Sequence, residues 1–328
     1  MYLRTFNFHE QYKTLLMYLF IRMNHLVSTK QFDIDYLNMF FERAWDMKHV
    51  IGKMCKRLRG KIVGLVFFEP STRTMASFQA AAQNMGGSVI NINDVYSSTK
   101  KGESLEDTIR TMCSYCDAIV LRHPLIGSSA RAVNVATKPI INGGDGAGEH
   151  PTQALLDMFT ISEELGRYNR TISDGITVVF VGDLKHSRTI HSLIDLLCLY
   201  PGVKFIYVCP NGLEMPDEIV NAVRDRGINQ VFGLTLSEAI VDADVLYVTR
   251  IQRERFENIS DYESVVGSYV VDARLMSLAK EKMMVMHPLP RTGEIAVEVD
   301  SDPRCAYFKQ MENGVFMRMA ILDILLES

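Results

Sequence analysis

The chain has 328 residues, more than the roughly 100 to 200 of one ordinary domain, so its length predicts two domains. Hydrophobic residues make up 47% of it and charged residues 23%, which excludes a disordered chain, a collagen-like repeat and a disulfide scaffold. Its 35 basic and 39 acidic residues give a net charge of −4, and no segment concentrates like charges. The sequence therefore predicts no nucleic-acid partner and no membrane partner.

Residues 1–27 form an N-terminal extension whose role the sequence leaves open. Arg4, Lys13 and Arg22 are mixed there with aliphatic and aromatic residues, a composition that fits an amphipathic helix or a targeting extension. We favour the helix, and we expect a cytoplasmic protein, with organellar targeting as the alternative. Because no apolar stretch reaches the ~20 residues that span a bilayer, no transmembrane helix is predicted.

Beyond the extension, helical patterns alternate with apolar runs of strand length. Asp33 is expected to cap a helix through about Cys55, with an apolar face formed by Ile34, Leu37, Phe40, Phe41 and Trp45. The predicted strands are 62–68, 88–92, 118–121 and 139–141 in the first half, and 176–181, 203–208, 245–248 and 283–286 in the second. This alternation predicts an α/β fold with two doubly wound parallel-sheet lobes and an active-site cleft between them.

The domain boundary is expected near residue 168, inside the polar segment 166–175, which has no apolar periodicity. The first domain then covers 28–168 and the second 169–328. A C-terminal helix at about 313–327 is apolar on all sides, so we expect it to pack back on the first domain.

Cys113 and Cys116 form a Cys-x-x-Cys pair late in a helical pattern. A metal or redox site at such a pair needs an exposed helix start or a second pair at ligand spacing. The sequence offers neither, so we interpret the pair as core packing. We expect no metal and no cofactor.

Hydroxyl groups and a guanidinium follow the first predicted strand. Ligands of parallel sheets gather at the carboxyl ends of the strands, and there the sequence places Ser71, Thr72, Arg73 and Thr74 at a helix start. The amides and dipole of a helix start favour phosphate, and an arginine adds a charge-assisted contact. We therefore predict a phosphate site rather than an ordinary helix cap.

Two further candidates lie at later strand ends of the first half. Arg122 ends the strand at 118–121, and a glycine-rich loop at 142–148 permits close approach of a ligand to the backbone. His150 and Gln153 follow this loop on one helical face and are expected to point into the same space. A lone histidine at a helix start is commonly structural, so the residues alone leave the role of His150 open.

The second half repeats this arrangement. Arg188 follows its first strand, Arg250 and Gln252 follow the third, and Pro288 and Leu289 follow the fourth in a turn made rigid by prolines. The turn after the first strand lacks G-x-G-x-x-G, which disfavours a nicotinamide dehydrogenase. Each arginine taken singly is better explained as a solvated surface charge.

As a set, these motifs closely resemble the aspartate carbamoyltransferase family over about residues 28–327. The resemblance is carried by Phe-Glu-Pro-Ser-Thr-Arg-Thr at 68–74, Lys-Lys-Gly-Glu-Ser at 100–104, Arg-His-Pro at 122–124, Gly-Glu-His-Pro-Thr-Gln at 148–153, Gly-Asp-Leu-Lys-His-Ser-Arg-Thr at 182–189, Thr-Arg-Ile-Gln-Arg-Glu-Arg at 249–255 and His-Pro-Leu-Pro-Arg at 287–291. It implies transfer of a carbamoyl group from carbamoyl phosphate to L-aspartate, giving N-carbamoyl-L-aspartate and phosphate in pyrimidine biosynthesis.

The resemblance also implies a role for each candidate residue. Carbamoyl phosphate would contact Ser71, Thr72, Arg73, Thr74, Ser97, Lys101, Arg122, His150, Gln153, Pro288 and Leu289. Aspartate would contact Lys101, Arg188, Arg250, Gln252 and Leu289. The catalytic residues would be Arg73, Thr74, Lys101, Arg122 and His150. Ser97 and Lys101 match a loop that in this family reaches the neighbouring subunit's site, which implies a homotrimer with shared sites.

The charges of the two substrates are consistent with this function. Carbamoyl phosphate and aspartate bring about four negative charges, which would be costly to bury unpaired. The sequence supplies five cations for them: Arg73, Lys101, Arg122, Arg188 and Arg250.

Two other functions stay open. An ornithine carbamoyltransferase would be expected to carry His-Cys-Leu-Pro where this chain has His-Pro-Leu-Pro from His287. In such an enzyme, Arg250 would also repel the ammonium group of ornithine. A non-catalytic paralogue acting as an assembly partner would be expected to lack some of the ligand residues, which are all present here.

Overall fold

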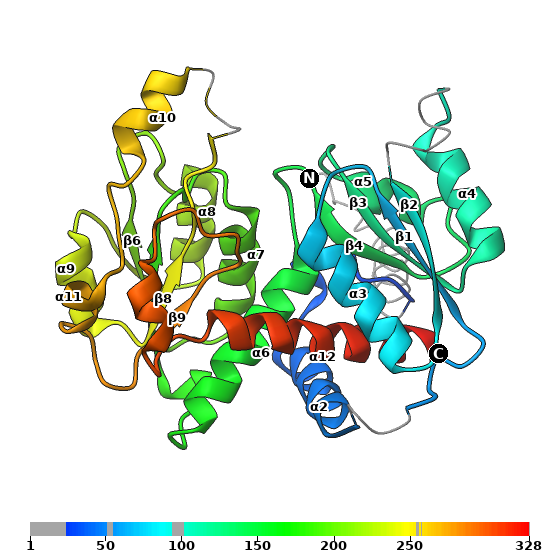
Figure 1. Cartoon of the computed structure of the whole chain (residues 1–328), viewed down its shortest axis with the longest axis horizontal. Helices are drawn as coiled ribbons and strands as arrows, with labels where there is room; N and C mark the ends of the chain where they lie inside the picture. The colour runs from blue at the N-terminus through cyan, green and yellow to red at the C-terminus, as the bar shows by residue number, and fades with distance from the viewer. Residues whose placement is uncertain (1–23, 51–54, 94–101, 254–255, 257, 328) are drawn as a thin grey trace, which may run out of the picture. The chain divides into compact units, whose positions relative to one another are not determined.

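The structure is a computed structural model of the chain, and it describes residues 24–50, 55–93, 102–253, 256 and 258–327 (Figure 1). The chain divides into two compact units. Unit 1 comprises Met1–Pro151 with Arg318–Ser328, and unit 2 comprises Thr152–Met317.

The units divide at Pro151, earlier than the polar segment near residue 168 predicts. The reason is that α6 (Pro151–Gly166) lies in unit 2 from Thr152 onward and makes buried polar contacts with other parts of that unit, for example from Asp157 to the hydroxyl of Tyr247. The C-terminal helix α12 (Tyr307–Leu326) begins earlier than residue 313, and the division between the units passes through it at Arg318.

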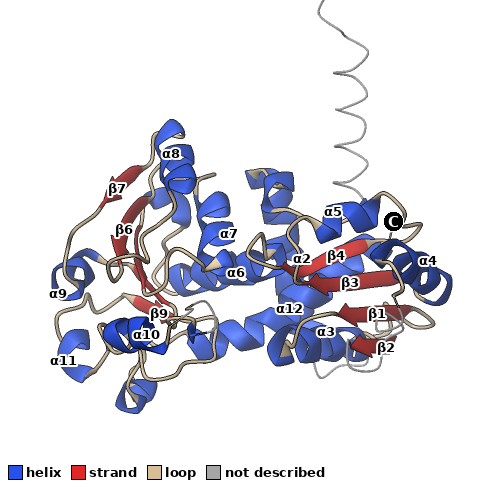
Figure 2. Cartoon of the chain, turned by 90° about the horizontal axis from the view of Figure 1, so that it is seen from above, coloured by secondary structure: helices blue, strands red, loops and turns tan. Residues whose placement is uncertain are grey.

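Unit 1 is built on a four-stranded sheet in the order β2-β1-β3-β4, and all neighbouring strands are parallel (Figure 2). Its strands are β1 (Ile62–Phe67), β2 (Ser88–Asn93), β3 (Ala118–His123) and β4 (Ile140–Asp145). Each overlaps one of the predicted apolar runs. Its helices are α2 (Ile34–Val50), α3 (Thr72–Asn84), α4 (Leu105–Tyr115) and α5 (Ser128–Val133).

Helices cover both faces of this sheet. The chain runs outward from β1 to β2 and then back across to β3, so right-handed crossovers place α3 on one face and α4 with α5 on the other. Cys113 and Cys116 pack in the core on the α4 face, with exposed fractions of only 7% and 3%. Burial raises the pKa of the Cys116 thiol to about 11. The predicted core role of the pair is therefore confirmed.

The apolar face of α2 is narrower than the sequence predicts. Asp33 does cap the helix, because its Oδ1 accepts the Tyr36 amide at 2.8 Å. Ile34 and Trp45, however, are 38% and 37% exposed, so these two residues of the expected apolar face lie outside the core. The buried positions are Leu37, Phe40, Phe41, Ala44 and Met47. Ala44 takes the core position next to Trp45, which turns the indole outward. The helix ends at Val50, and residues 51–54 lie outside the described part of the chain.

Unit 2 is built on a five-stranded parallel sheet in the order β7-β6-β5-β8-β9. Its strands are β5 (Thr177–Val181), β6 (Lys204–Val208), β7 (Asn229–Val231), β8 (Val245–Val248) and β9 (Met284–Met286). Its shorter helices are α7 (Arg188–Leu197), α8 (Asp217–Asp225), α9 (Leu236–Ala239), α10 (Ile259–Val265) and α11 (Ala273–Met276). The sequence did not predict β7, a three-residue edge strand with polar residues at two positions.

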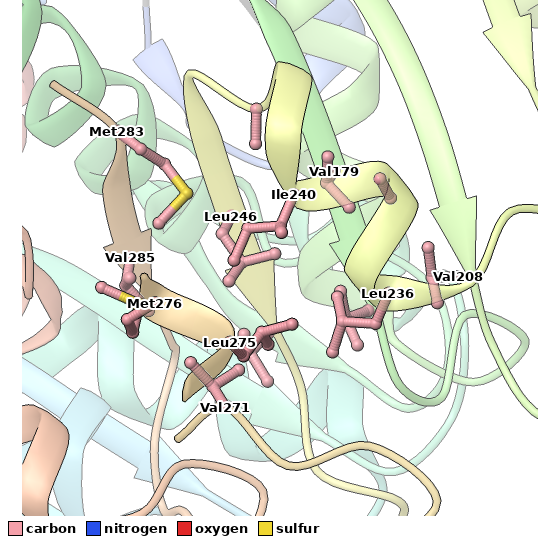
Figure 3. Packing of buried hydrophobic residues seen from close by; sticks show 14 of the residues in the cluster. Val179, Val208, Leu236, Ile240, Leu246, Val271, Leu275, Met276, Met283 and Val285 are labelled. Carbon is pink, nitrogen blue, oxygen red and sulfur yellow. The ribbon is translucent and has the colours of Figure 1, made fainter. Parts of the chain in front are cut away.

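The core of unit 2 shows why its strands are apolar throughout. Alternate residues of β5, such as Val179, join a cluster with Leu236 of α9 and Leu275 of α11 (Figure 3). The intervening residue Phe180 faces the other side, where its ring lies 6.0 Å from that of Tyr247. Both faces of this sheet are covered, so the predicted α/β class with two doubly wound parallel sheets is confirmed.

The described residues contain neither a membrane-spanning helix nor a metal-binding cluster. None of their helices is both long and apolar enough to cross a bilayer. The same residues contain no group of three or more His, Cys, Asp or Glu side chains that could hold a metal ion.

Candidate active site

The predicted phosphate segment lies at the point where the connections of the first sheet diverge. β1 is followed by β2 on one side, while β3 lies on the other side of β1. Ligands of parallel sheets bind at the carboxyl ends of the strands at such a point. Ser71, Thr72, Arg73 and Thr74 follow β1, and Arg122 is the penultimate residue of β3. The structure therefore brings both predicted elements to one edge of unit 1.

The start of α3 is suited to an anion. Ser71 is its N-cap in an extended conformation, and the helix begins at Thr72. The first amides of a helix have no partner within it and carry the positive end of the helix dipole. Thr72 and Arg73 are exposed, Ser71 is half-buried and Thr74 is buried. The segment can thus offer amides, hydroxyls and a guanidinium to a phosphate group.

Thr74 and Arg122 lie at Gly143 of β4, and His150 lies beside Thr74. The Thr74 hydroxyl is 3.3 Å from His150 Nε2, and Arg122 Nη1 donates to the Gly143 carbonyl at 3.1 Å. A Cβ at Gly143 would lie 3.6 Å from the Thr74 methyl carbon. These three side chains, which the family resemblance places among the catalytic residues, are therefore neighbours in unit 1.

Glu69 lies beside Arg122 in this site, although no sequence motif singled it out for a role. Its Oε2 lies 3.4 Å from Nε of Arg122, and the amide of the adjacent Phe68 donates to the Arg122 carbonyl at 2.8 Å. The carboxylate therefore forms an ion pair with the guanidinium. Its place in the turn between a buried strand and Pro70 was the signal that could have indicated it.

The glycine-rich loop before His150 is held by Asp145. The carboxylate of Asp145 accepts the Glu149 amide at 2.7 Å. Gly146 has φ +56°, and a Cβ there would lie 2.2 Å from the carbonyl oxygen of Pro124, so this position requires glycine. The loop brings His150, only 4% exposed, to Thr74.

Ser97 and Lys101 lie outside the described residues. The roles that the sequence gives them stay predictions.

In unit 2 the connections diverge between β5 and β8. Arg188 begins α7 after β5, and Arg250 and Gln252 follow β8; all three are half-buried. Gly182 has φ +111°, and a Cβ there would lie 2.1 Å from the carbonyl oxygen of Thr249. The two loops that carry the arginines therefore run against each other, which places both cations at one edge of the sheet.

A pocket of about 110 Å³ opens at this edge of unit 2, lined among others by Thr249, Ile251, Thr292 and Glu294. Burial acts to raise the pKa of Glu294, but hydrogen bonds from His287 and the Thr292 amide outweigh it, so the pKa is lowered. The pocket thus combines hydroxyl groups with an ionised carboxylate.

The turn after β9 is fixed by hydrogen bonds. Nδ1 of His287 accepts the Leu289 amide at 2.8 Å, while Nε2 lies 2.7 Å from Glu294 Oε1. Leu289 has φ +54°, an unusual conformation for a residue with a side chain and one that is enriched at functional sites. Pro288 and Leu289 are half-buried.

Gln153, on α6, is oriented by Asp157. Its Nε2 donates to Asp157 Oδ1 at 2.8 Å. No sequence motif singled out Asp157 for a role. A single acid between Leu156 and Met158 in an apolar helix was the signal that could have indicated it.

The described residues can therefore bind anions in each unit. Unit 1 offers a helix start with Arg73 and Arg122, and unit 2 offers Arg188 and Arg250. Thr74, Arg122 and His150 can donate to an oxygen that becomes negative during a reaction.

Family models match both halves of the chain. The model described as aspartate/ornithine carbamoyltransferase, carbamoyl-P binding domain, matches residues 24–163. The model described as aspartate/ornithine carbamoyltransferase, Asp/Orn binding domain, matches residues 174–325.

Relatives of known name agree with these models. The aspartate carbamoyltransferase catalytic subunit of Archaeoglobus fulgidus is 46% identical over 304 residues, which are 92% of this chain and 98% of that protein. The multifunctional protein pyr1-3 of Dictyostelium discoideum is 50% identical over 302 residues. The match covers 92% of this chain but only 13% of that much longer protein.

A solved structure has the same fold. Aspartate transcarbamoylase from Trypanosoma cruzi, in complex with carbamoyl phosphate and aspartate, superimposes with a TM-score of 0.86 at 44% sequence identity. The superposition covers 93% of this chain and 97% of that one.

Proposed function

The chain belongs to the aspartate/ornithine carbamoyltransferase family, and on that premise we propose that it transfers the carbamoyl group of carbamoyl phosphate to the amine of L-aspartate. The products are N-carbamoyl-L-aspartate and phosphate, in the second step of de novo pyrimidine biosynthesis.

The choice of aspartate over ornithine rests on the two arginines of unit 2. Arg188 and Arg250 follow adjacent strands, β5 and β8, and Gly182 holds their loops together. Two guanidinium groups match the two carboxylates of aspartate, since each can form a bidentate contact. An ornithine side chain would bring an ammonium group towards a cation, which is unfavourable.

The first substrate is assigned to unit 1. Ser71, Thr72 and Arg73 bind the phosphate of carbamoyl phosphate at the start of α3, and Arg122 contributes a second positive charge. Thr74, Arg122 and His150 polarise the carbamoyl oxygen and stabilise the charge that it gains in the tetrahedral intermediate. Gln153 Oε1 and the carbonyls of Pro288 and Leu289 accept from the carbamoyl nitrogen.

The reaction needs an unprotonated aspartate amine, which attacks the carbamoyl carbon while the bond to the phosphate oxygen breaks. The leaving phosphate takes the proton that the amine loses. The protein contributes mainly orientation and electrostatic stabilisation. Carbamoyl phosphate binds before aspartate.

We assign the active form to a homotrimer in which Ser97 and Lys101 complete the site of a neighbouring subunit. The apolar side chains of Leu125 and Ile126 are 57% and 69% exposed beside the glycine-rich loop, as is typical of surfaces that bind a partner. Arg73→Ala and Lys101→Ala, each inactive alone, should regain partial activity when mixed and reassembled. Mixtures that stay inactive would exclude shared sites.

The experiment that tests the function measures phosphate release from carbamoyl phosphate. The wild-type protein should release phosphate only when L-aspartate is present. Arg250→Ala should raise the KM for aspartate about 10- to 100-fold, the effect of one charge-assisted contact, and leave the KM for carbamoyl phosphate near its original value. Release that does not depend on aspartate would exclude the proposal.

A further inference from the structure

Asp157 is an acid that the folded chain buries completely, in the middle of α6. Its carboxylate accepts hydrogen bonds from Gln153 Nε2 at 2.8 Å, the Tyr247 hydroxyl at 2.7 Å and Gln310 Nε2 at 2.6 Å. Burying a carboxylate is costly even with such partners. An apolar residue would serve the core of this helix at least as well, so the acid calls for a specific explanation.

The first consequence concerns the orientation of Gln153. A carboxylate has acceptors only, whereas an amide side chain has a donor end and an acceptor end. Asp157 therefore fixes the NH2 group of Gln153 towards itself, and the carbonyl oxygen Oε1 points away from it. Without the acid, the amide could rotate and present its donor end instead.

The second consequence concerns the turn after β9. Gln310 donates to Asp157 with Nε2, and its Oε1 accepts the backbone amide of His287 at 2.9 Å. His287 Nδ1 in turn accepts the amide of Leu289. The same carboxylate is thus connected through one glutamine to the backbone that carries the carbonyls of Pro288 and Leu289.

We propose that Asp157 is a positioning residue that aims three acceptors at the NH2 group of the carbamoyl moiety: Gln153 Oε1 and the carbonyls of Pro288 and Leu289. This inference rests on the proposed function, which assigns those acceptors. A carbamoyl NH2 group has two N–H donors and needs acceptors. A site that presented an amide donor there would bind it poorly, because a buried polar group would be left unpaired.

A second buried acid in the same unit provides a matched control. Asp244 accepts the Thr177 amide at 2.8 Å and pairs with Arg170 at 2.9 Å and with Lys280 at 3.3 Å. None of these partners is a candidate site residue. Asp244→Asn therefore perturbs a buried carboxylate of unit 2 without reaching Gln153 or the turn after β9.

The test is a double-mutant cycle between Asp157→Asn and Gln153→Ala, with carbamoyl phosphate varied at saturating aspartate. Asp157→Asn alone should lower kcat/KM for carbamoyl phosphate about 100-fold, since it disturbs the glutamine and the turn together. In the Gln153→Ala background, Asp157→Asn should lower kcat/KM no more than about 10-fold. The reason is that one of the two connections of Asp157 to the acceptors, the one through Gln153, is already lost there. Asp244→Asn should lower the Tm but leave kcat/KM within about twofold.

A structural role alone would give equal effects of Asp157→Asn in both backgrounds, and that result overturns the inference. Gln310→Met removes only the connection to His287 and should lower kcat/KM about 10-fold. This variant tests the inference even if Asp157→Asn does not fold. If Gln310→Met has the same kcat/KM as the wild-type protein, the claim that Asp157 acts on the turn after β9 through Gln310 is overturned. A wild-type protein without aspartate-dependent turnover overturns the proposed function, and this inference with it.

Discussion

The hydroxyl of Thr74 lies 3.3 Å from Nε2 of His150. Thr74 is in the first turn of the helix after β1, and His150 follows the glycine-rich loop after β4. Both side chains are almost fully buried. The fold thus pairs two polar groups that the proposed mechanism assigns to the same carbamoyl oxygen.

Removing one of these donors should slow the chemical step. Thr74→Val keeps the shape of the side chain and deletes the hydroxyl, so we expect kcat to fall about 100-fold or more, as for other oxyanion donors. Steady-state kinetics of carbamoyl aspartate formation measure the effect. Thr108→Val, a buried threonine of α4, is the control and should keep kcat within about twofold. Equal effects of the two substitutions would show that the loss comes from folding.

The arginines of unit 2 should act through their geometry as well as their charge. Arg188→Lys keeps the positive charge but loses the planar bidentate donor group. We expect the KM for aspartate to rise about 10-fold, and Arg188→Ala to raise it further. Arg224→Lys on the exposed face of α8 should change neither kinetic constant. An unchanged KM in Arg188→Lys would remove this side chain from the aspartate site.

The close approach at Gly182 should tolerate no side chain. Gly182→Ala would place a Cβ 2.1 Å from the Thr249 carbonyl oxygen, so the loops carrying Arg188 and Arg250 must separate. We expect a loss of about 2–4 kcal/mol in unfolding free energy and a higher KM for aspartate. Gly212 also has a positive φ but has open space around it. Gly212→Ala should therefore lower the unfolding free energy by only about 1–2 kcal/mol and leave the KM for aspartate unchanged. Equal losses would refute the steric explanation.

Stability should fall in mildly acidic solution because of His25. Burial lowers the pKa of His25 to about 4 from its ordinary 6.5, and Nδ1 accepts the amide of Ile140 at 3.1 Å, which requires the neutral ring. Between pH 6.5 and 4 the unfolded chain takes up a proton that the folded chain does not. The unfolding free energy therefore falls with pH across this window, by about 3 kcal/mol in total.

His25→Asn keeps an acceptor at the same position and cannot titrate. Denaturant unfolding of both proteins at several pH values between 7 and 4 measures the difference between them. The advantage of the wild-type protein at pH 7 should shrink steadily as the pH falls. A constant difference would contradict the assigned shift.

The parallel sheets, and the positions of most candidate site residues at the ends of strands, were predictable because their signals are local. Runs such as 245–248 are apolar at every position, a pattern that is typical of a strand covered on both faces. Polar residues that follow such runs then indicate the edge of the sheet where ligands bind. β7 was not predicted because a three-residue edge strand with Asn229 and Gln230 carries no such signal. Trp45 was misplaced because periodicity cannot tell which side of a wide apolar stripe is covered.

The residues that orient the site were harder to predict from the sequence. Glu69 acts on Arg122, and Asp157 acts on Gln310, through contacts between segments distant in the chain. Sequence patterns indicate which residues lie at the end of a strand. Contacts such as those of Glu69 and Asp157, however, depend on how the distant segments fold together.

The most direct test of the central claim identifies the product. The wild-type protein is incubated with carbamoyl phosphate and either L-aspartate or L-ornithine at equal concentration, and the carbamoylated amino acid is quantified by mass spectrometry. The two arginines of unit 2 predict N-carbamoyl-L-aspartate and no citrulline above the uncatalysed background. Citrulline as the main product, or neither product from folded protein, would contradict it.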